Sequence, residues 1–166
     1  ISINTKFESI RYEGFGPYKV GFIIDTLTDN KNRTASSLRT SFQKNNGNLG
    51  TQGSAAHNFK NLGVIRLEKK NIEENKLLKI LIDLEVENYF SNLDYYEIHC
   101  KSNELFVLKN KLEKHFINFI STNIEWLPIN LITLDNDKKN QVIQFIDILE
   151  ENDDVQKVYT NLNFNN

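Results

Sequence analysis

The sequence predicts an α+β protein made of two small α/β sandwich domains, with the second domain inserted into the first. Two observations lead to this fold class. Apolar segments with strand character alternate along the chain with segments whose apolar residues recur every three or four positions, as in amphipathic helices. The length of 166 residues, 39% of them hydrophobic and 25% charged, suits two small domains with cores rather than a disordered chain.

The first predicted elements are two strands joined by a tight turn. Residues 7–13 and 20–27 have the apolar content of strands, and residues 14–17 between them read Gly-Phe-Gly-Pro, a combination typical of turns. Residues 20–24 contain no polar side chain, which indicates a central strand buried on both faces.

A helix is expected next, over residues 33–45. Asn30 or Asn32 can cap its start, and Asn46 with Gly47 tolerates the left-handed backbone that ends a helix. One side of the helix carries Ala35, Leu38 and Phe42, and the opposite side carries Arg33, Ser37, Thr40 and Lys44. We therefore expect the apolar side to pack on the sheet and a basic, hydroxyl-bearing stripe to face solvent.

The remaining elements divide the chain into two domains. In order, we expect a hairpin from residues 55–59 and 63–67, a helix at 72–84, a strand at 95–100, a helix at 104–116, and strands at 119–126 and 131–134, followed by a helix at 138–150 and a strand at 155–164. Pro128 marks a return to the first domain. This gives a discontinuous domain from residues 1–66 and 129–166, with an inserted domain at 67–128.

The net charge of −2 hides an asymmetry along the chain. The first 66 residues contain nine Lys/Arg against four Asp/Glu, so the remainder is strongly acidic. This predicts a basic discontinuous domain and an acidic inserted domain, a polarity that orients a protein toward a polyanion. A chance distribution of solvated charges is the alternative interpretation.

Several polar side chains are candidates for contact with nucleic acid. Arginine presents a planar fork that matches phosphate oxygens, lysine adds a point charge, and amides or hydroxyls bond sugar and phosphate. The candidates are Arg11, Asn30, Lys31, Asn32, Arg33, Arg39, Lys44, Asn48 and Ser54. A structural interpretation also stands, in which Arg33 and Asn30 hold the turn together and Arg11 pairs with Glu13 or Asp25.

The spacing Gly47-x-x-Gly50-x-x-Gly53 is similar to a phosphate-binding loop. Such loops follow a strand and precede a helix, so that the helix N-terminus meets the phosphate. Here the glycines follow a helix and precede a strand. We therefore expect a tight turn whose exposed amides touch a nucleic-acid backbone, and no nucleotide pocket.

No residue set typical of an enzyme emerges from the sequence. His57, His99 and His115 are too scattered for a metal motif, and Cys100, the single cysteine, cannot complete a zinc site by local spacing. There is no catalytic triad or carboxylate pair. The protein is predicted to be non-enzymatic, with no metal, no cofactor and no small-molecule substrate.

The composition also bears on the compartment. A lone cysteine fits a reducing environment, no apolar run approaches the roughly 18 residues of a membrane span, and no signal peptide is visible. We expect a soluble monomer that does not bind membranes.

Five segments carry a resemblance to a known family: residues 11–17 (Arg-Tyr-Glu-Gly-Phe-Gly-Pro), 28–34, 47–54, 126–128 and 153–161. Together they resemble the YebC family, which includes the mitochondrial translational activator of cytochrome oxidase subunit I. The resemblance implies two α/β domains, one interrupting the other, and a basic helical N-terminal domain that is missing from this sequence. Leu84-Glu85-Val86 departs from the small-residue segment usual in the family.

The resemblance implies a non-enzymatic regulator of gene expression that binds nucleic acid. A translation factor acting on the ribosome or RNA is favoured, because no helix has the groove-reading residues of a duplex reader. A transcriptional regulator that binds duplex DNA is the alternative, and a structural ribosome-associated or scaffold protein is a second one. The bacterial cytoplasm or the mitochondrial matrix is the expected location.

Overall fold

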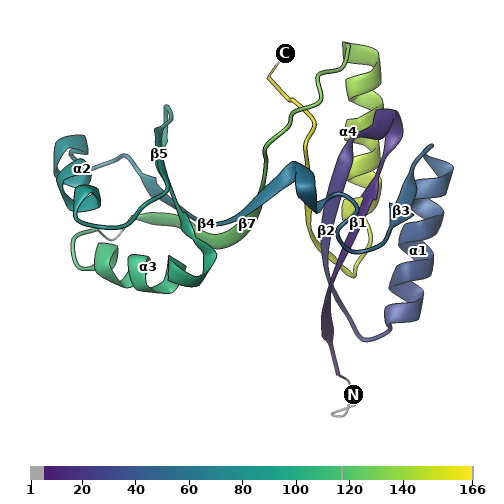
Figure 1. Cartoon of the computed structure of the whole chain (residues 1–166), viewed down its shortest axis with the longest axis horizontal. Coiled ribbons are helices and arrows are strands. Elements are labelled where there is room, and N and C mark those ends of the chain that lie inside the picture. Colours follow the sequence, from purple (N-terminus) through teal and green to yellow (C-terminus); the bar gives the residue numbers. More distant parts are fainter. Residues whose placement is uncertain (1–5, 117, 166) are drawn as a thin grey trace. The chain divides into compact units, whose positions relative to one another are not determined.

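The computed structural model describes residues 6–116 and 118–165, and the predicted α+β class is confirmed over them. Contacts divide the chain into two compact units, which Figure 1 traces along the sequence. Unit 1 consists of Ile1–Lys60 and Leu127–Asn166, and unit 2 is Asn61–Trp126. The sequence placed the boundaries at 66/67 and 128/129. The contacts divide the chain at 60/61 and 126/127, and both of these positions fall within continuous strands, β4 (Phe59–Glu68) and β7 (Phe119–Pro128).

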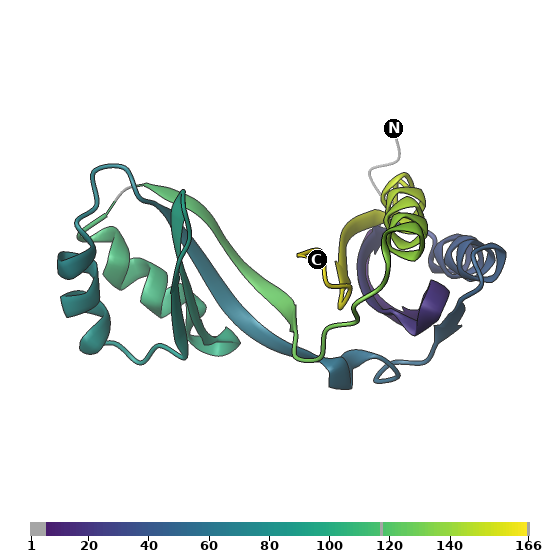
Figure 2. The ribbon, with the colours of Figure 1, turned by 90° about the horizontal axis from the view of Figure 1, so that it is seen from above.

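Unit 1 is a four-stranded antiparallel sheet in the order β3-β1-β2-β8 among the described residues, with two helices packed on one face. Its elements are β1 (Glu8–Phe15), β2 (Gly21–Thr28), α1 (Lys31–Lys44), β3 (Asn48–Gly50), α4 (Asn136–Glu150) and β8 (Val155–Thr160). Figure 2 shows α1 and α4 side by side along the sheet. The predicted strand at 131–134 is wrong: that segment forms a single parallel bridge, Ile132 to Leu162.

The core of unit 1 explains the apolar segment at the start of β2. Phe22 and Ile24 point into the helices, while Ile23 points to the other face, and all three are fully buried. The ring of Phe22 packs edge-on against Phe42 of α1 and Phe145 of α4, at centroid distances of 6.1 and 5.2 Å. The prediction of a central strand is thus confirmed, and aromatic packing joins both helices to it.

Helix α1 begins two residues earlier than expected and is capped as expected. The side chain of Asn30 accepts a hydrogen bond from the amide of Arg33 at 3.1 Å. At the other end Asn46 adopts a left-handed φ of 60°, and the Gly47 amide donates to the carbonyl of Phe42 at 2.8 Å. Local residue chemistry therefore sets both ends of this helix.

The turn between β1 and β2 contains the short 3-10 segment Pro17–Lys19. Tyr18 and Lys19 both have positive φ, at 60° and 63°. Each such residue other than glycine costs about 1 kcal/mol, because Cβ approaches the following carbonyl. The Gly16 amide donates to the Val20 carbonyl at 2.8 Å and closes the turn.

Unit 2, like unit 1, has a four-stranded sheet with two helices packed against it; the strand order is β5-β6-β4-β7 over the described residues. The elements of unit 2 and its borders are β4 (Phe59–Glu68), α2 (Glu74–Ile82), β5 (Asn88–Ser91), β6 (Tyr95–Lys101), α3 (Leu105–Glu113) and β7 (Phe119–Pro128). Leu77 and Leu81 of α2 and Leu112 of α3 pack with Ile65 and Ile98 of the sheet. The core of this unit is separate from that of unit 1.

The predicted hairpin at 55–59 and 63–67 is wrong. Residues Ala56–Asn58 form a 3-10 turn, and β4 then runs without a break through Lys60 and Asn61. The predicted turn of this hairpin lies at residues 60–62, which include Lys60 and Asn61. In the structure β4 lies between β6 and β7 in the sheet, and its pairing with β6 begins at Leu62, opposite Lys101.

Candidate nucleic-acid interface

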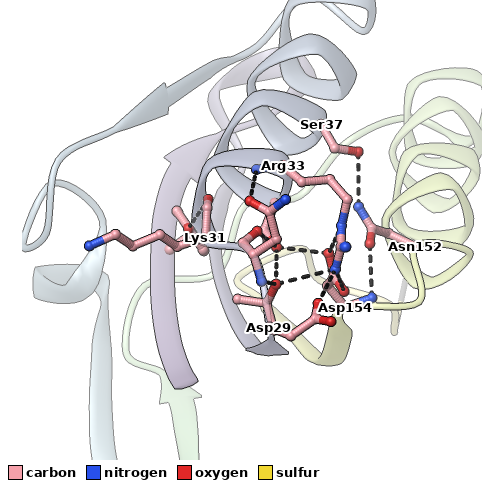
Figure 3. A network of polar contacts seen from close by, with 10 residues as sticks. Asp29, Lys31, Arg33, Ser37, Asn152 and Asp154 are labelled. Atoms are coloured by element: carbon pink, nitrogen blue, oxygen red, sulfur yellow. Dashed lines mark hydrogen bonds and ion pairs between the residues drawn. The ribbon is translucent and has the colours of Figure 1, made fainter. Parts of the chain in front are cut away.

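The start of α1 is joined to the turn between α4 and β8 by a polar network, drawn in Figure 3. Arg33 holds Asp154 with two hydrogen bonds, from Nε at 3.2 Å and from a terminal nitrogen at 2.7 Å. The same guanidinium bonds Asp29 at 3.0 Å. Two carboxylates therefore occupy the fork of Arg33, one from the turn before α1 and one from the turn before β8.

Hydroxyl and amide groups complete this network. Thr34, fully buried on the inner side of α1, donates to Asp154 Oδ2 at 2.7 Å and lies 2.8 Å from the Thr28 hydroxyl. Asn152 donates to the Ser37 hydroxyl and accepts from the Asp154 amide. The bonds from Arg33, and then that from Thr34, hold the pKa of Asp154 below its usual range despite partial burial.

A groove beside this network is lined by both α1 and the end of α4. It presents the carboxylates of Asp29, Glu151, Asp153 and Asp154 against the single guanidinium of Arg33. An anionic backbone is repelled by such a lining. All four residues of the predicted stripe on α1 are exposed, but the stripe divides: Arg33 and Ser37 line the acidic groove, whereas Thr40 and Lys44 lie outside it.

The glycine-rich turn is held by Glu13 from strand β1. This carboxylate is almost completely buried and accepts hydrogen bonds from three backbone amides, those of Gly53 at 2.8 Å, Ala55 at 3.1 Å and Ala56 at 2.8 Å. Arg11 Nε lies 3.3 Å from the same carboxylate. Burial opposes ionisation of Glu13, but the three amides and Arg11 outweigh it and keep its pKa below the usual range.

This geometry changes the role expected for the turn. The Gly53, Ala55 and Ala56 amides point inward to Glu13, so they are not offered to a nucleic-acid backbone. The Ser54 hydroxyl oxygen is buried next to Gly50 and has no hydrogen-bond partner among the described residues. Of the predicted contact residues in this region, Asn48 on β3 is exposed to solvent.

Three of the predicted cations remain open to solvent on α1. Lys31, Arg39 and Lys44 are exposed, and none forms an ion pair within the described part of the chain. In Figure 3 the Lys31 side chain points away from the Arg33 network. Asn32 is exposed beside them, while the Asn30 side-chain oxygen caps the helix.

The charge asymmetry lies inside unit 1 rather than between the two units. Residues 1–60 carry eight Lys/Arg and four Asp/Glu, whereas residues 127–166 carry three and seven. Unit 1 thus has eleven of each sign, and unit 2 has nine basic and eleven acidic residues. The basic discontinuous domain expected from the sequence is therefore neutral as a whole, and its positive potential is local.

Two residues central to this site were not predicted. Glu13 was considered only as a partner of Arg11, and Asp154 only as part of the segment 153–161 that resembles the family. The sequence does contain a hint of such a partner. Thr34 lies on the same side of the helix as Leu38 and Phe42, so its buried hydroxyl requires a polar group in the interior, which Asp154 supplies.

Neither a metal-binding cluster nor a membrane-spanning helix is found in the described residues. No group of three His, Cys, Asp or Glu side chains in the described residues is arranged to hold a metal ion. No helix in that part of the chain is long and apolar enough to cross a membrane.

Comparison with known proteins identifies the family. A family profile described as the TACO1/YebC second and third domain matches residues 7–162. The chain belongs to the TACO1/YebC family. The resemblance predicted from the sequence motifs is confirmed, and the matched region corresponds to two of the domains in that family.

Individual members of the TACO1/YebC family agree with this assignment. A probable transcriptional regulatory protein of Pelagibacter ubique is 47% identical over 166 residues, which are 100% of this chain and 69% of that protein. A protein of the same description from Geobacillus thermodenitrificans is 40% identical over 161 residues, 96% of this chain and 65% of its own length. The crystal structure of a conserved hypothetical protein from Aquifex aeolicus superposes with a TM-score of 0.84 at 33% identity, covering 98% of this chain and 68% of the other.

Proposed function

We propose that this chain is part of a regulator of gene expression and binds nucleic acid, with RNA or the ribosome as its target. Its relatives are named probable transcriptional regulatory proteins, which supports a regulatory rather than an enzymatic role. The observation that carries the proposal is the set of exposed cations on α1, Lys31, Arg39 and Lys44, which have no acidic partner within the described residues. We call these three residues the α1 cation set.

The α1 cation set suits weak, salt-sensitive contact with phosphates. Each phosphate contact to a single strand lowers the logarithm of the binding constant by about 0.7 per decade of salt. Three contacts predict a slope of about −2, or a loss of about 20-fold in affinity between 50 and 200 mM salt. The neutral charge of unit 1 limits long-range attraction, so specificity has to come from other contacts.

RNA is favoured over duplex DNA by the position of α1. A recognition helix inserts its side chains into the major groove. Helix α1 instead packs its apolar side on the sheet, and its exposed side carries short residues, such as Ser36 and Thr40, among scattered cations. Binding of duplex DNA is the second candidate, because the relatives are named transcriptional regulatory proteins.

The test is a binding series with a charge-reversed α1. Lys31→Glu, Arg39→Glu and Lys44→Glu are combined, and binding to labelled single-stranded RNA, structured RNA, duplex DNA and purified ribosomes is measured at 50–200 mM KCl. A matched control makes the same change in charge in unit 2 at three exposed lysines, Lys76, Lys79 and Lys114.

We expect at least a tenfold loss of RNA or ribosome binding for the α1 variant and little change for the control. Equal losses in both variants, or binding that does not depend on salt, would contradict the proposed surface. Tighter binding to duplex DNA than to any RNA would support the transcriptional alternative.

A further inference from the structure

An exposed aromatic residue occupies the β1–β2 turn, in a backbone conformation that favours glycine. Tyr18 has φ 60° and ψ 27°, and Lys19 follows with φ 63°. Turns of this kind usually contain Asn-Gly or Gly-Gly, since side chains are disfavoured at both central positions. The backbone conformation therefore disfavours a tyrosine and a lysine here, so their side chains have to contribute through contacts within unit 1 or at its surface.

The Tyr18 ring is held in place by the first half of α4. Its hydroxyl donates a hydrogen bond to Gln141 Oε1 at 2.7 Å, and the Lys138 ammonium lies 5.3 Å from the ring centroid. The side chain is nevertheless 39% exposed. An aromatic ring that is fixed at one end and open to solvent loses little conformational freedom when a flat partner stacks on it.

Positive side chains gather at this same end of unit 1. Lys19 and Lys138 are exposed. Gly47, three residues after the end of α1 at Lys44, packs against the backbone of Phe15, so the end of α1 lies close to the turn. Figure 1 shows the β1–β2 turn, the end of α1 and the start of α4 at this end.

Two carboxylates reduce the positive potential at this end. Asp135 accepts the Lys138 amide at 2.9 Å as the cap of α4, and Asp137 lies in the first turn of that helix. Charge alone is therefore modest, and binding at this end has to depend on the aromatic ring as well.

We propose that Tyr18, Lys19, Lys44 and Lys138, here called the basic-aromatic tip, bind unpaired nucleotides of RNA. The Tyr18 ring stacks on one base, and the lysine ammonium groups contact the flanking phosphates. An unpaired strand fits better than a duplex, because a base inside a helix has no free face for a ring to stack on. This inference rests on the proposed function and adds a base-stacking contact to the α1 cation set.

The decisive variant is Tyr18→Gly combined with Lys19→Gly. Glycine adopts the left-handed region without strain, which offsets part of the loss of the Tyr18 contacts, so this variant is expected to fold, and thermal unfolding checks that it does. We expect its affinity for single-stranded RNA to fall about tenfold, a typical effect of removing one stacked base contact. Binding to fully paired RNA should change less than threefold.

A second variant separates stacking from side effects. Tyr18→Phe loses the bond to Gln141 but keeps the ring, and its affinity for single-stranded RNA should stay within about twofold of the wild type. Lys44 is left unchanged in both variants, because it also belongs to the α1 cation set.

The outcomes distinguish this inference from the proposed function. If the double glycine variant binds single-stranded RNA like the wild type while the charge-reversed α1 variant does not, the basic-aromatic tip is refuted and the proposed function stands. An equal loss for paired and unpaired RNA would refute the stacking contact. If the wild-type chain binds no nucleic acid at all, both proposals fail together.

Discussion

Replacing Glu13 tests whether a single buried carboxylate holds the glycine-rich turn. Glu13→Ala leaves the amides of Gly53, Ala55 and Ala56 without their acceptor and removes the carboxylate that lies 3.3 Å from Arg11 Nε. Gly53 is exposed and its amide can turn to water, but Ala55 is fully buried. The cost therefore falls mainly on the two alanine amides.

The magnitude follows from the value of hydrogen bonds to a charged acceptor. Two such bonds at about 1.5–2 kcal/mol each give a loss of about 3–4 kcal/mol in the free energy of unfolding. Glu13→Gln keeps the oxygen that serves Ala55 and Ala56 but places an amide donor toward Gly53 and Arg11. We expect a loss of about 2 kcal/mol for this variant, or a urea midpoint lower by roughly 1 M.

The pH dependence of stability provides an independent check. Because the pKa of Glu13 is lowered on folding from its ordinary value of 4.5, its contribution is fully present above that value. It is lost as pH falls below 4.5 and through the folded-state pKa. The stability difference between wild type and Glu13→Gln should therefore shrink between pH 5 and pH 3.

The assay is urea unfolding followed by circular dichroism at pH 7 and across that range. Glu8→Gln serves as the matched control, since Glu8 is exposed on the same strand. If Glu13→Ala unfolds within about 0.5 kcal/mol of Glu8→Gln, the carboxylate does not hold the turn and the reasoning from its hydrogen bonds is wrong.

Two further predictions concern ion pairs. Asp154→Asn should lower the melting temperature clearly more than Asp153→Asn, its exposed neighbour, because it removes the charge that Arg33 holds with two hydrogen bonds; equal shifts in thermal unfolding would argue against the network. In unit 2, Glu125→Gln should destabilise by about 2 kcal/mol, since Arg66 bonds it at 2.6 Å in a partly buried site. Adding Arg66→Met should restore part of that loss, which a double-mutant cycle in urea would measure, and additive effects would show that the pair is not coupled.

Local features of unit 1 could be predicted from the sequence because they depend on neighbours along the chain. The apolar residues 20–24 require burial on both faces. Asn30 caps the start of α1 through a bond to the Arg33 amide, and the left-handed φ of Asn46 lets the next amide form a bond to a carbonyl of the last turn. The hairpin at 55–67 failed for the opposite reason. Its polar residues resemble a turn, but they belong to one long strand, β4, which lies in the sheet between β6 and β7, two strands that come later in the chain.

The candidate site shows the same division. The sequence identified which cations exist and placed Arg39 and Lys44 on a surface helix, with Lys31 in the turn before it; the structure puts all three on α1 and leaves them exposed. It could not show that Arg33 meets Asp154, a partner 121 residues away along the chain.

By itself, then, the sequence determined the α+β class, the family and the supply of charges, because these depend on composition, periodicity and motifs. Tertiary structure alone decided which charges are neutralised: Glu13 captures the amides of a distant turn, and the acidic segment 127–166 balances the basic one within unit 1. The physical reason is that electrostatic and hydrogen-bond energies depend on distances of a few ångströms in space, which separation along the chain does not specify.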